Sequence, residues 1–136
     1  LPIQAPTPRP TEIPGPPTAA LAAAGGIPVR GELGTFTWEG MGSDSPFLVV
    51  SRDRALTGSG PFTVTIAPPL AIADWSAAWV RVSGGTTIGR LVKLHGSGTE
   101  IAVAPPPVAG DWSLGVDIRF ATGDTTAFYW RVEVRP

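Results

Sequence analysis

The strongest structural signal in the chain is residues 112–134, which read WSLGVDIRFATGDTTAFYWRVEV. Apolar residues alternate with polar or small ones over Leu114–Phe120 and again over Phe128–Val134. An alternation of period two over seven residues is typical of a half-buried strand, because successive side chains point to opposite faces. The intervening residues 121–126 contain Gly123-Asp124, which favours a turn. The segment therefore predicts two strands joined as a hairpin.

The charged residues of this hairpin occupy the polar phase of each strand. Asp117 and Arg119 precede the turn, and Arg131 and Glu133 follow it. We expect them to face one another as exposed cross-strand pairs, each worth at most about 1 kcal/mol.

The same alternation recurs toward the N-terminus, at Phe36 and Trp38 and over Phe62–Ile66. Clusters of Gly, Pro and Ser separate further apolar segments, and we expect strands at 47–52, 75–83, 87–95 and 99–104. No helical period is evident after residue 27. The sequence predicts an all-β fold, an immunoglobulin-like β-sandwich of about eight strands, with a closed barrel as the alternative.

Two stretches of sequence match at an offset of 37 residues. Ala67-Pro68-Pro69 and Asp74-Trp75-Ser76 correspond to Ala104-Pro105-Pro106 and Asp111-Trp112-Ser113. Proline ends a strand because it cannot donate to the ladder, and the Trp opens the next strand. We interpret the repeat as one corner used twice, where the chain changes sheet and a ring closes the end of the core. The alternative is that Trp75 and Trp112 face a ligand.

The first seventeen residues, LPIQAPTPRPTEIPGPP, contain seven prolines. Each proline fixes φ and favours an extended conformation in the residue before it, so the segment should resemble polyproline II and form few ladder hydrogen bonds. Such a segment does not order itself, so it requires the surface of its own domain, of a neighbouring copy or of another protein, and we expect it to dock on a neighbouring copy. Residues 27–33 could pair as a strand.

We therefore divide the chain into a Pro/Ala-rich extended N-terminal arm, residues 1–26, and a β-sandwich domain, residues 27–136. Within the arm, residues 18–26 read TAALAAAGG and favour either a short helix or a small-residue segment buried in an interface. The apolar side chains expected to contact the partner are Leu1, Ile3, Ile13 and Leu21.

Composition excludes several classes of function. The chain has 10 basic and 11 acidic residues and a net charge of −1, so no basic field attracts nucleic acid, and we expect no nucleic-acid partner. No cysteine is present, which excludes disulfides, zinc–thiolate sites and a cysteine nucleophile. No apolar run approaches the roughly 20 residues of a membrane-spanning helix, so we expect no transmembrane segment.

Catalytic and metal-binding motifs are also missing from the sequence. His95 is the one imidazole, and its position before Gly96-Ser97-Gly98 favours an exposed strand end. The carboxylates are dispersed, and neither a nucleophile elbow nor an EF-hand spacing occurs. We therefore expect no catalytic residue, no metal and no cofactor. Trp79 and Tyr129 lie on the polar phase of their strands and are the candidates for an outward aromatic binding surface.

The segment from Ala109 to Asp117, with the Gly-Asp hairpin and the Val-Glu-Val ending, resembles the last hairpin of bacterial immunoglobulin-like export domains. The resemblance covers about the final 30 residues. Some such domains handle copper, which requires clustered His, Met or Cys ligands. This chain has His95 and Met41 far apart in sequence, so no copper-binding motif can be carried over.

These observations favour a non-enzymatic secreted structural subunit of an extracellular or cell-surface assembly, filament-like, that forms homo-oligomers through the arm. The alternatives are a carbohydrate- or protein-binding module and an extracytoplasmic accessory subunit of a membrane complex. A chain that begins with Leu1 fits a mature protein after signal-peptide removal. The lack of Asn and the high Pro content fit either heat adaptation or a GC-rich genome.

Overall fold

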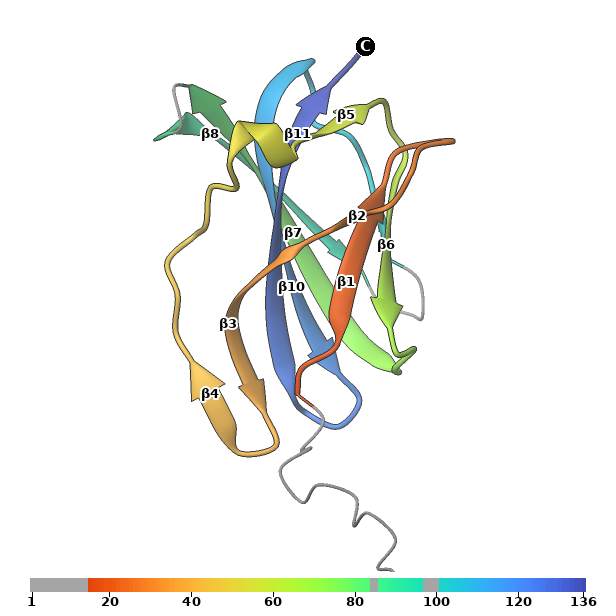
Figure 1. Ribbon diagram of the computed structural model, residues 1–136, viewed down its shortest axis with the longest axis vertical. Coiled ribbons are helices and arrows are strands. Elements are labelled where there is room, and N and C mark those ends of the chain that lie inside the picture. Colours follow the sequence, from red (N-terminus) through yellow and green to blue (C-terminus); the bar gives the residue numbers. More distant parts are fainter. Residues whose placement is uncertain (1–14, 84–85, 97–100) are drawn as a thin grey trace, which may run out of the picture.

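The computed structural model describes residues 15–83, 86–96 and 101–136 (Figure 1). These residues form almost entirely strands and connecting loops, with one short 3-10 turn, η1, at Arg52–Arg54. The prediction of an all-β fold is therefore confirmed for the described residues.

Two sheets make up the described structure. The smaller sheet has the order β2-β1-β6-β9 and contains β1 (Thr18–Ala22), β2 (Val29–Arg30), β6 (Phe62–Ala67) and β9 (Ile101–Val103). The larger sheet has seven strands, of which six follow the order β4-β3-β11-β10-β7-β8. They are β3 (Glu32–Trp38), β4 (Met41–Ser43), β7 (Ile72–Ser83), β8 (Thr86–Gly96), β10 (Gly110–Phe120) and β11 (Thr125–Val134). The seventh, β5 (Leu56–Gly58), pairs in parallel with β11, whereas the other neighbours are antiparallel.

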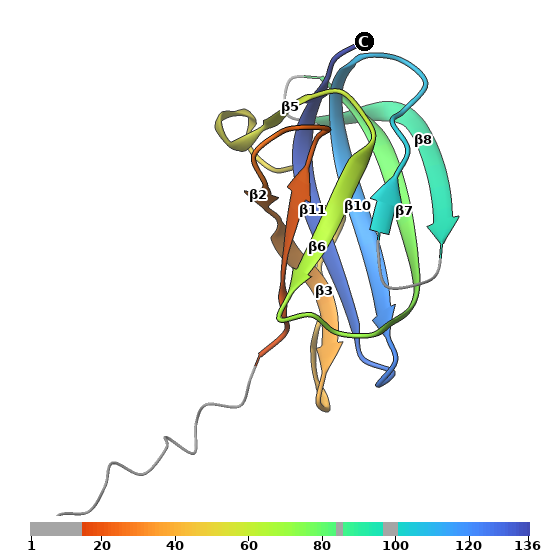
Figure 2. The same cartoon turned by 90° about the vertical axis from the view of Figure 1, so that its right-hand side faces the viewer.

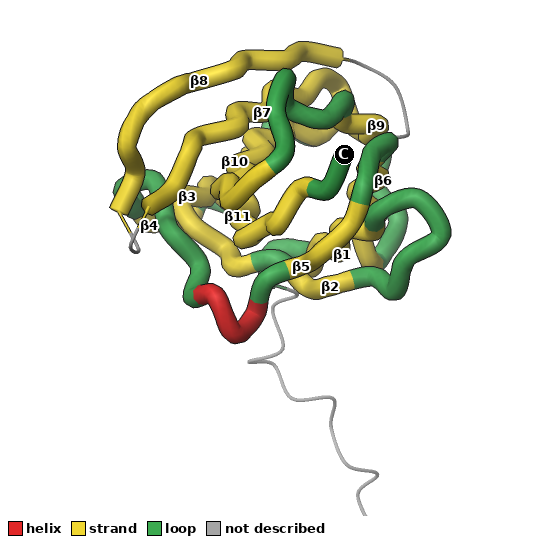
Figure 3. Tube along the Cα trace, turned by 90° about the horizontal axis from the view of Figure 1, so that it is seen from above, coloured by secondary structure: helices red, strands yellow, loops and turns green. Residues whose placement is uncertain are grey.

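The two sheets lie face to face, as the turned view in Figure 2 shows, and their inner side chains form one core. The smaller sheet contributes alternate residues of β1, β6 and β9, such as Leu21, Phe62 and Ile101. The larger sheet contributes three tryptophans that are 0 to 2% exposed, Trp79, Trp112 and Trp130. Viewed from above, β8 lies at the margin of the larger sheet, beyond β7 (Figure 3).

The predicted C-terminal hairpin is confirmed. β10 and β11 pair continuously from Gly110 opposite Val134 to Arg119 opposite Thr125. The predicted cross-strand charge pairs are wrong, because Asp117 lies opposite Ala127 in this register. Arg119 instead pairs with Asp74 on the other neighbouring strand, β7.

The repeated Ala-Pro-Pro to Asp-Trp-Ser unit changes sheet both times. Its first copy leads from β6 in the smaller sheet to β7 in the larger one, and its second copy leads from β9 to β10. Trp75 is 7% exposed and Trp112 is 0% exposed. The Trp112 indole N–H donates to the Val108 carbonyl at 3.0 Å, so the ring is fixed within its own corner. The structural interpretation of the repeat is confirmed.

The predicted boundary at residue 27 conflicts with the position of β1. Residues 18–22 are neither a helix nor an arm but the second strand of the smaller sheet, and all five pair with β6. Ala19, Leu21 and Ala23 are buried while their neighbours are partly exposed. The helix propensity of alanine is weak compared with the pairing and burial that β1 gains between β2 and β6. The sandwich therefore starts at the end of the proline-rich segment.

The strand expected at 47–52 is also absent. This segment is irregular and ends in η1, and it crosses the outer face of β10 and β11. Its carbonyl groups bind side chains of that face: Ser113 Oγ donates to Leu48 O at 3.2 Å and Arg131 Nη1 to Val50 O at 3.1 Å. These side chains satisfy the backbone groups that a ladder would otherwise satisfy.

Candidate functional site

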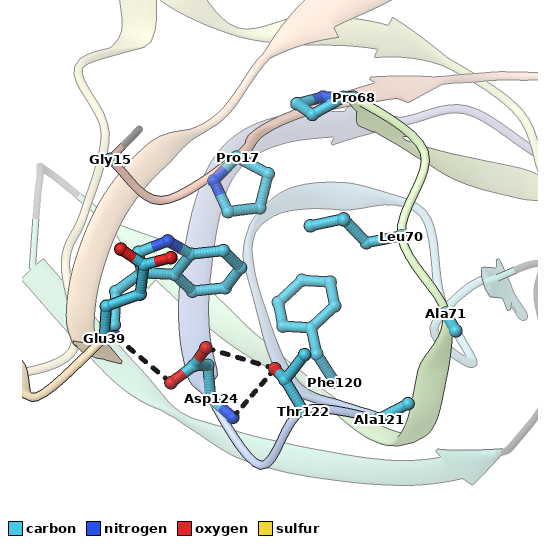
Figure 4. A pocket seen from close by; sticks show the side chains of 11 residues that line it. Gly15, Pro17, Glu39, Pro68, Leu70, Ala71, Phe120, Ala121, Thr122 and Asp124 are labelled. Carbon is cyan, nitrogen blue, oxygen red and sulfur yellow. Dashed lines mark hydrogen bonds between the residues drawn. The ribbon is translucent and has the colours of Figure 1, made fainter. Parts of the chain in front are cut away.

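An apolar pocket of about 390 Å³ opens at the end of the sandwich where β1 begins. The β3–β4 turn, the β10–β11 turn and the first sheet-crossing corner meet there (Figure 1). Its walls are formed by Gly15, Pro17, Trp38, Glu39, Pro68, Leu70, Ala71, Phe120, Ala121, Thr122 and Asp124 (Figure 4). The C-terminus lies at the opposite end of the molecule.

The wall of the pocket is aromatic and aliphatic. Trp38 and Phe120 meet edge to face, with ring centroids 5.4 Å apart and an angle of 89° between the planes. Phe120 is buried, whereas Trp38 is only partly covered and so presents part of its indole to the pocket. The Pro17 ring and the Leu70 side chain lie near the Phe120 ring and extend this apolar wall (Figure 4). This surface suits an apolar, ring-shaped or extended ligand.

The rim of the pocket carries two carboxylates, from Glu39 and Asp124. Asp124 is held in place, because its Oδ1 accepts the Glu39 backbone N–H at 3.2 Å and its Oδ2 accepts the Thr122 hydroxyl at 3.1 Å. Glu39 is exposed, and its side chain lies on the same side of the pocket as that of Asp124 (Figure 4). One side of an otherwise apolar pocket is therefore negatively charged.

The β3–β4 turn that carries Glu39 has an unusual backbone. Trp38 pairs with Met41, so Glu39 and Gly40 are the two central residues of a tight hairpin. Both have positive φ, 48° and 81°, as a type I′ turn requires. A residue with a side chain is disfavoured in this region, and Asn or Gly commonly occupies the first central position. Glu39 thus occupies a position where its backbone is strained.

We expect Glu39→Asn to raise the free energy of unfolding by about 0.5–1 kcal/mol, because asparagine tolerates positive φ better than glutamate does. Urea denaturation of both chains measures the difference. Glu39→Gln is the matched control, since it removes the same charge and keeps the unfavourable backbone preference. An equal gain in the Gln variant would assign the effect to charge and contradict the prediction.

The expected partner-binding residues of the arm do not come together in the described structure. Leu1, Ile3 and Ile13 lie outside the described residues. Leu21 is 0% exposed and packs in the core of its own sandwich, so the prediction that it contacts a partner is wrong. Alternate residues of β1 face inward, and Leu21 is the largest of them.

The two expected surface aromatics are also buried. Trp79 is 0% exposed and lies in the core, where its indole N–H donates to Ala104 O at 2.8 Å. The prediction that Trp79 faces outward is wrong because the alternation is interrupted within β7. The strand register shifts between Val80 and Val82, and Val82 therefore joins the inward face on which Trp79 lies.

Tyr129 lies on the outer face of the larger sheet, as its phase predicts, but only 7% of it is exposed. Phe47 of the irregular segment covers it, with ring centroids 4.8 Å apart. A Cβ atom at Gly115 would lie 2.8 Å from Phe47, so this packing needs glycine there. Burial, and secondarily the charge of Asp117, raises the pKa of the Tyr129 hydroxyl.

Sequence reasoning missed the pocket itself. The sequence pattern places Trp38 only in a strand with Phe36, and it places Phe120 and Asp124 only in the C-terminal hairpin. The separate signals were present, since Pro68 belongs to a predicted corner and Asp124 to a predicted turn. Which turns share one end of the molecule depends on strand order, and an alternating pattern does not contain that information.

Neither a metal centre nor a membrane-spanning helix is found in the described parts of the chain. Among residues 15–83 and 101–136, no group of three or more His, Cys, Asp or Glu side chains converges. The same residues contain no helix that is long and apolar enough to cross a bilayer.

Comparison with known proteins leaves the pocket as the main guide to function. No protein-family model matches the chain, and no curated protein or solved structure is significantly similar to it.

Proposed function

We propose that this chain is a secreted, non-enzymatic structural subunit of an extracellular or cell-surface assembly, and that its sandwich is immunoglobulin-like. The leader, defined here as residues 1–14, docks on a neighbouring copy. The facing sheets and the two matched crossings between them support the immunoglobulin-like class.

One observation carries the proposal: the molecule has an open apolar pocket lined by Gly15, the residue to which the leader is joined. The described core is built from residues between Ala19 and Val134. The leader contains five prolines in fourteen residues, so it is better suited to a groove than to a ladder. Proline-rich segments dock in aromatic-lined grooves because their extended form costs little entropy to fix.

The alternative of a carbohydrate- or protein-binding module rested on Trp79 and Tyr129 as neighbouring exposed rings. Both rings are buried by the chain itself. The burial of both rings therefore favours the assembly subunit over the binding module.

Sedimentation velocity of the full chain over a range of concentrations tests the proposal. We expect self-association that is lost when residues 1–14 are removed. At concentrations where both chains are monomeric, the shortened chain should unfold at the same denaturant concentration as the full chain, since it keeps β1. A full chain that stays monomeric, or a shortened chain that associates equally well, would overturn the proposed function.

A further inference from the structure

We infer that the pocket is the acceptor for Pro8-Arg9-Pro10 of a second copy's leader, and that two copies exchange their leaders reciprocally. The inference rests on the proposed function and specifies both the site and the partner. The occupant is thus a segment of this same chain, and the geometry points to a closed pair as the unit from which any larger assembly is built.

The chemistry of the pocket matches that of the segment. Trp38, Phe120 and Leu70 provide an apolar surface for proline rings. Pro17 already packs there, which shows that the wall accepts such a ring. The pocket is about as large as the smaller ligand sites of proteins, which begin at about 300 Å³.

The charges of the rim and the leader are complementary. Arg9 is the only basic residue among residues 1–14, and prolines flank it on both sides. The acceptor rim presents Glu39 and Asp124 beside the apolar wall. A guanidinium can bind a carboxylate and stack on an aromatic ring, so Arg9 suits a site where acids border Trp38.

The length of the leader restricts where the second copy can lie. Arg9 precedes Gly15 by six residues, which span about 19 Å in a polyproline conformation. Gly15 itself lines the pocket, so the point at which the leader is attached lies at the same end as the acceptor. The pocket of the partner must therefore lie within about 19 Å of this end. When two copies meet at this end, the leader of each copy reaches the pocket of the other. The two contacts are then equivalent, and a two-fold axis relates the copies.

Binding of the leader to its own pocket requires the chain to reverse within those six residues. Pro10, Pro14 and Pro16 each bias the preceding residue toward an extended conformation. The return is therefore disfavoured, and exchange with a second copy keeps the segment extended.

Two full-length charge-reversal variants, Arg9→Glu and Glu39→Arg, test the inference. In a pair formed by either variant alone, position 9 of each leader and position 39 of the other copy carry charges of the same sign. We expect about tenfold weaker binding per contact, and therefore about 100-fold weaker self-association, for either variant alone. An equimolar mixture restores matched charges at both contacts, so we expect it to dimerise about as tightly as the original chain. Sedimentation velocity measures the dissociation constants, and thermal unfolding of each variant checks its fold.

The outcomes separate this inference from the proposed function. Self-association that depends on residues 1–14 but is unaffected by both reversals would refute the pocket as acceptor and leave the assembly proposal standing. Variants that do not rescue each other when mixed would refute exchange between copies and favour docking within one chain. Rescue in the form of open-ended polymers would refute the closed pair. A full chain that never associates would remove both proposals.

Discussion

A chain that begins at residue 27 is expected not to fold. The deletion removes β1, which lies between β2 and β6 in the smaller sheet and pairs along its whole length with β6. It also removes Leu21, which is 0% exposed, and truncating such a core side chain alone to alanine costs about 2–5 kcal/mol. With the pairing of both neighbours lost as well, the deficit approaches the whole stability of a typical domain, about 5–15 kcal/mol.

The matched control is the chain that begins at residue 15, which retains β1. We expect it to unfold cooperatively and, at concentrations where both chains are monomeric, with a free energy of unfolding within about 0.5 kcal/mol of the full chain. Circular dichroism during urea denaturation compares the three chains. A cooperative transition in the chain that begins at residue 27 would show that β1 is dispensable, and it would return the sandwich boundary to the position predicted from sequence.

Replacement of Trp79 by alanine is expected to lower the free energy of unfolding by about 3–5 kcal/mol. The indole packs against Phe62 and Trp112, with ring centroids 5.3 and 6.4 Å away. The substitution leaves a cavity between the two sheets and deprives the Ala104 carbonyl of its donor. Denaturant midpoints of the two chains give the difference.

Ile27→Ala is the control for a large apolar residue on the surface, because Ile27 is 83% exposed. Its effect should stay within about 0.5 kcal/mol. A similarly small loss in Trp79→Ala would place the indole outside the core, as the strand phase alone suggested, and would restore it as a candidate for an exposed binding surface.

The charged residues of the C-terminal hairpin show what the alternating pattern can and cannot predict. Alternation correctly placed Arg119 and Arg131 off the core face of their strands, but it did not identify their partners. Arg131 binds Asp111 through two nitrogens, at 2.6 and 2.5 Å, and is covered by the irregular segment before η1. This pairing raises the pKa of the Arg131 guanidinium further above its ordinary value. A partner depends on register and on the neighbouring strand, and neither is local information.

The candidate site was predictable only in its parts. The composition of the leader predicts that it docks on a surface, because its prolines lack the N–H groups that a strand ladder requires. The acceptor combines Trp38 from one hairpin, Phe120 and Asp124 from another, and Leu70 from a corner. These residues are up to 86 positions apart in the chain (124 minus 38), and they meet because β3, β11, β10 and β7 are consecutive strands of one sheet.

The sequence by itself determined the all-β class, the C-terminal hairpin and the repeated corner that changes sheet, because alternation and proline act over a few neighbouring residues. Only the tertiary structure decided that Thr18–Ala22 is a strand, that Trp79 faces inward and that three turns enclose a pocket. Each of these outcomes depends on burial against segments distant in sequence. In β1, burial outweighs the helix propensity of alanine. In β7, the register shift between Val80 and Val82 changes the face of the strand on which the following side chains lie.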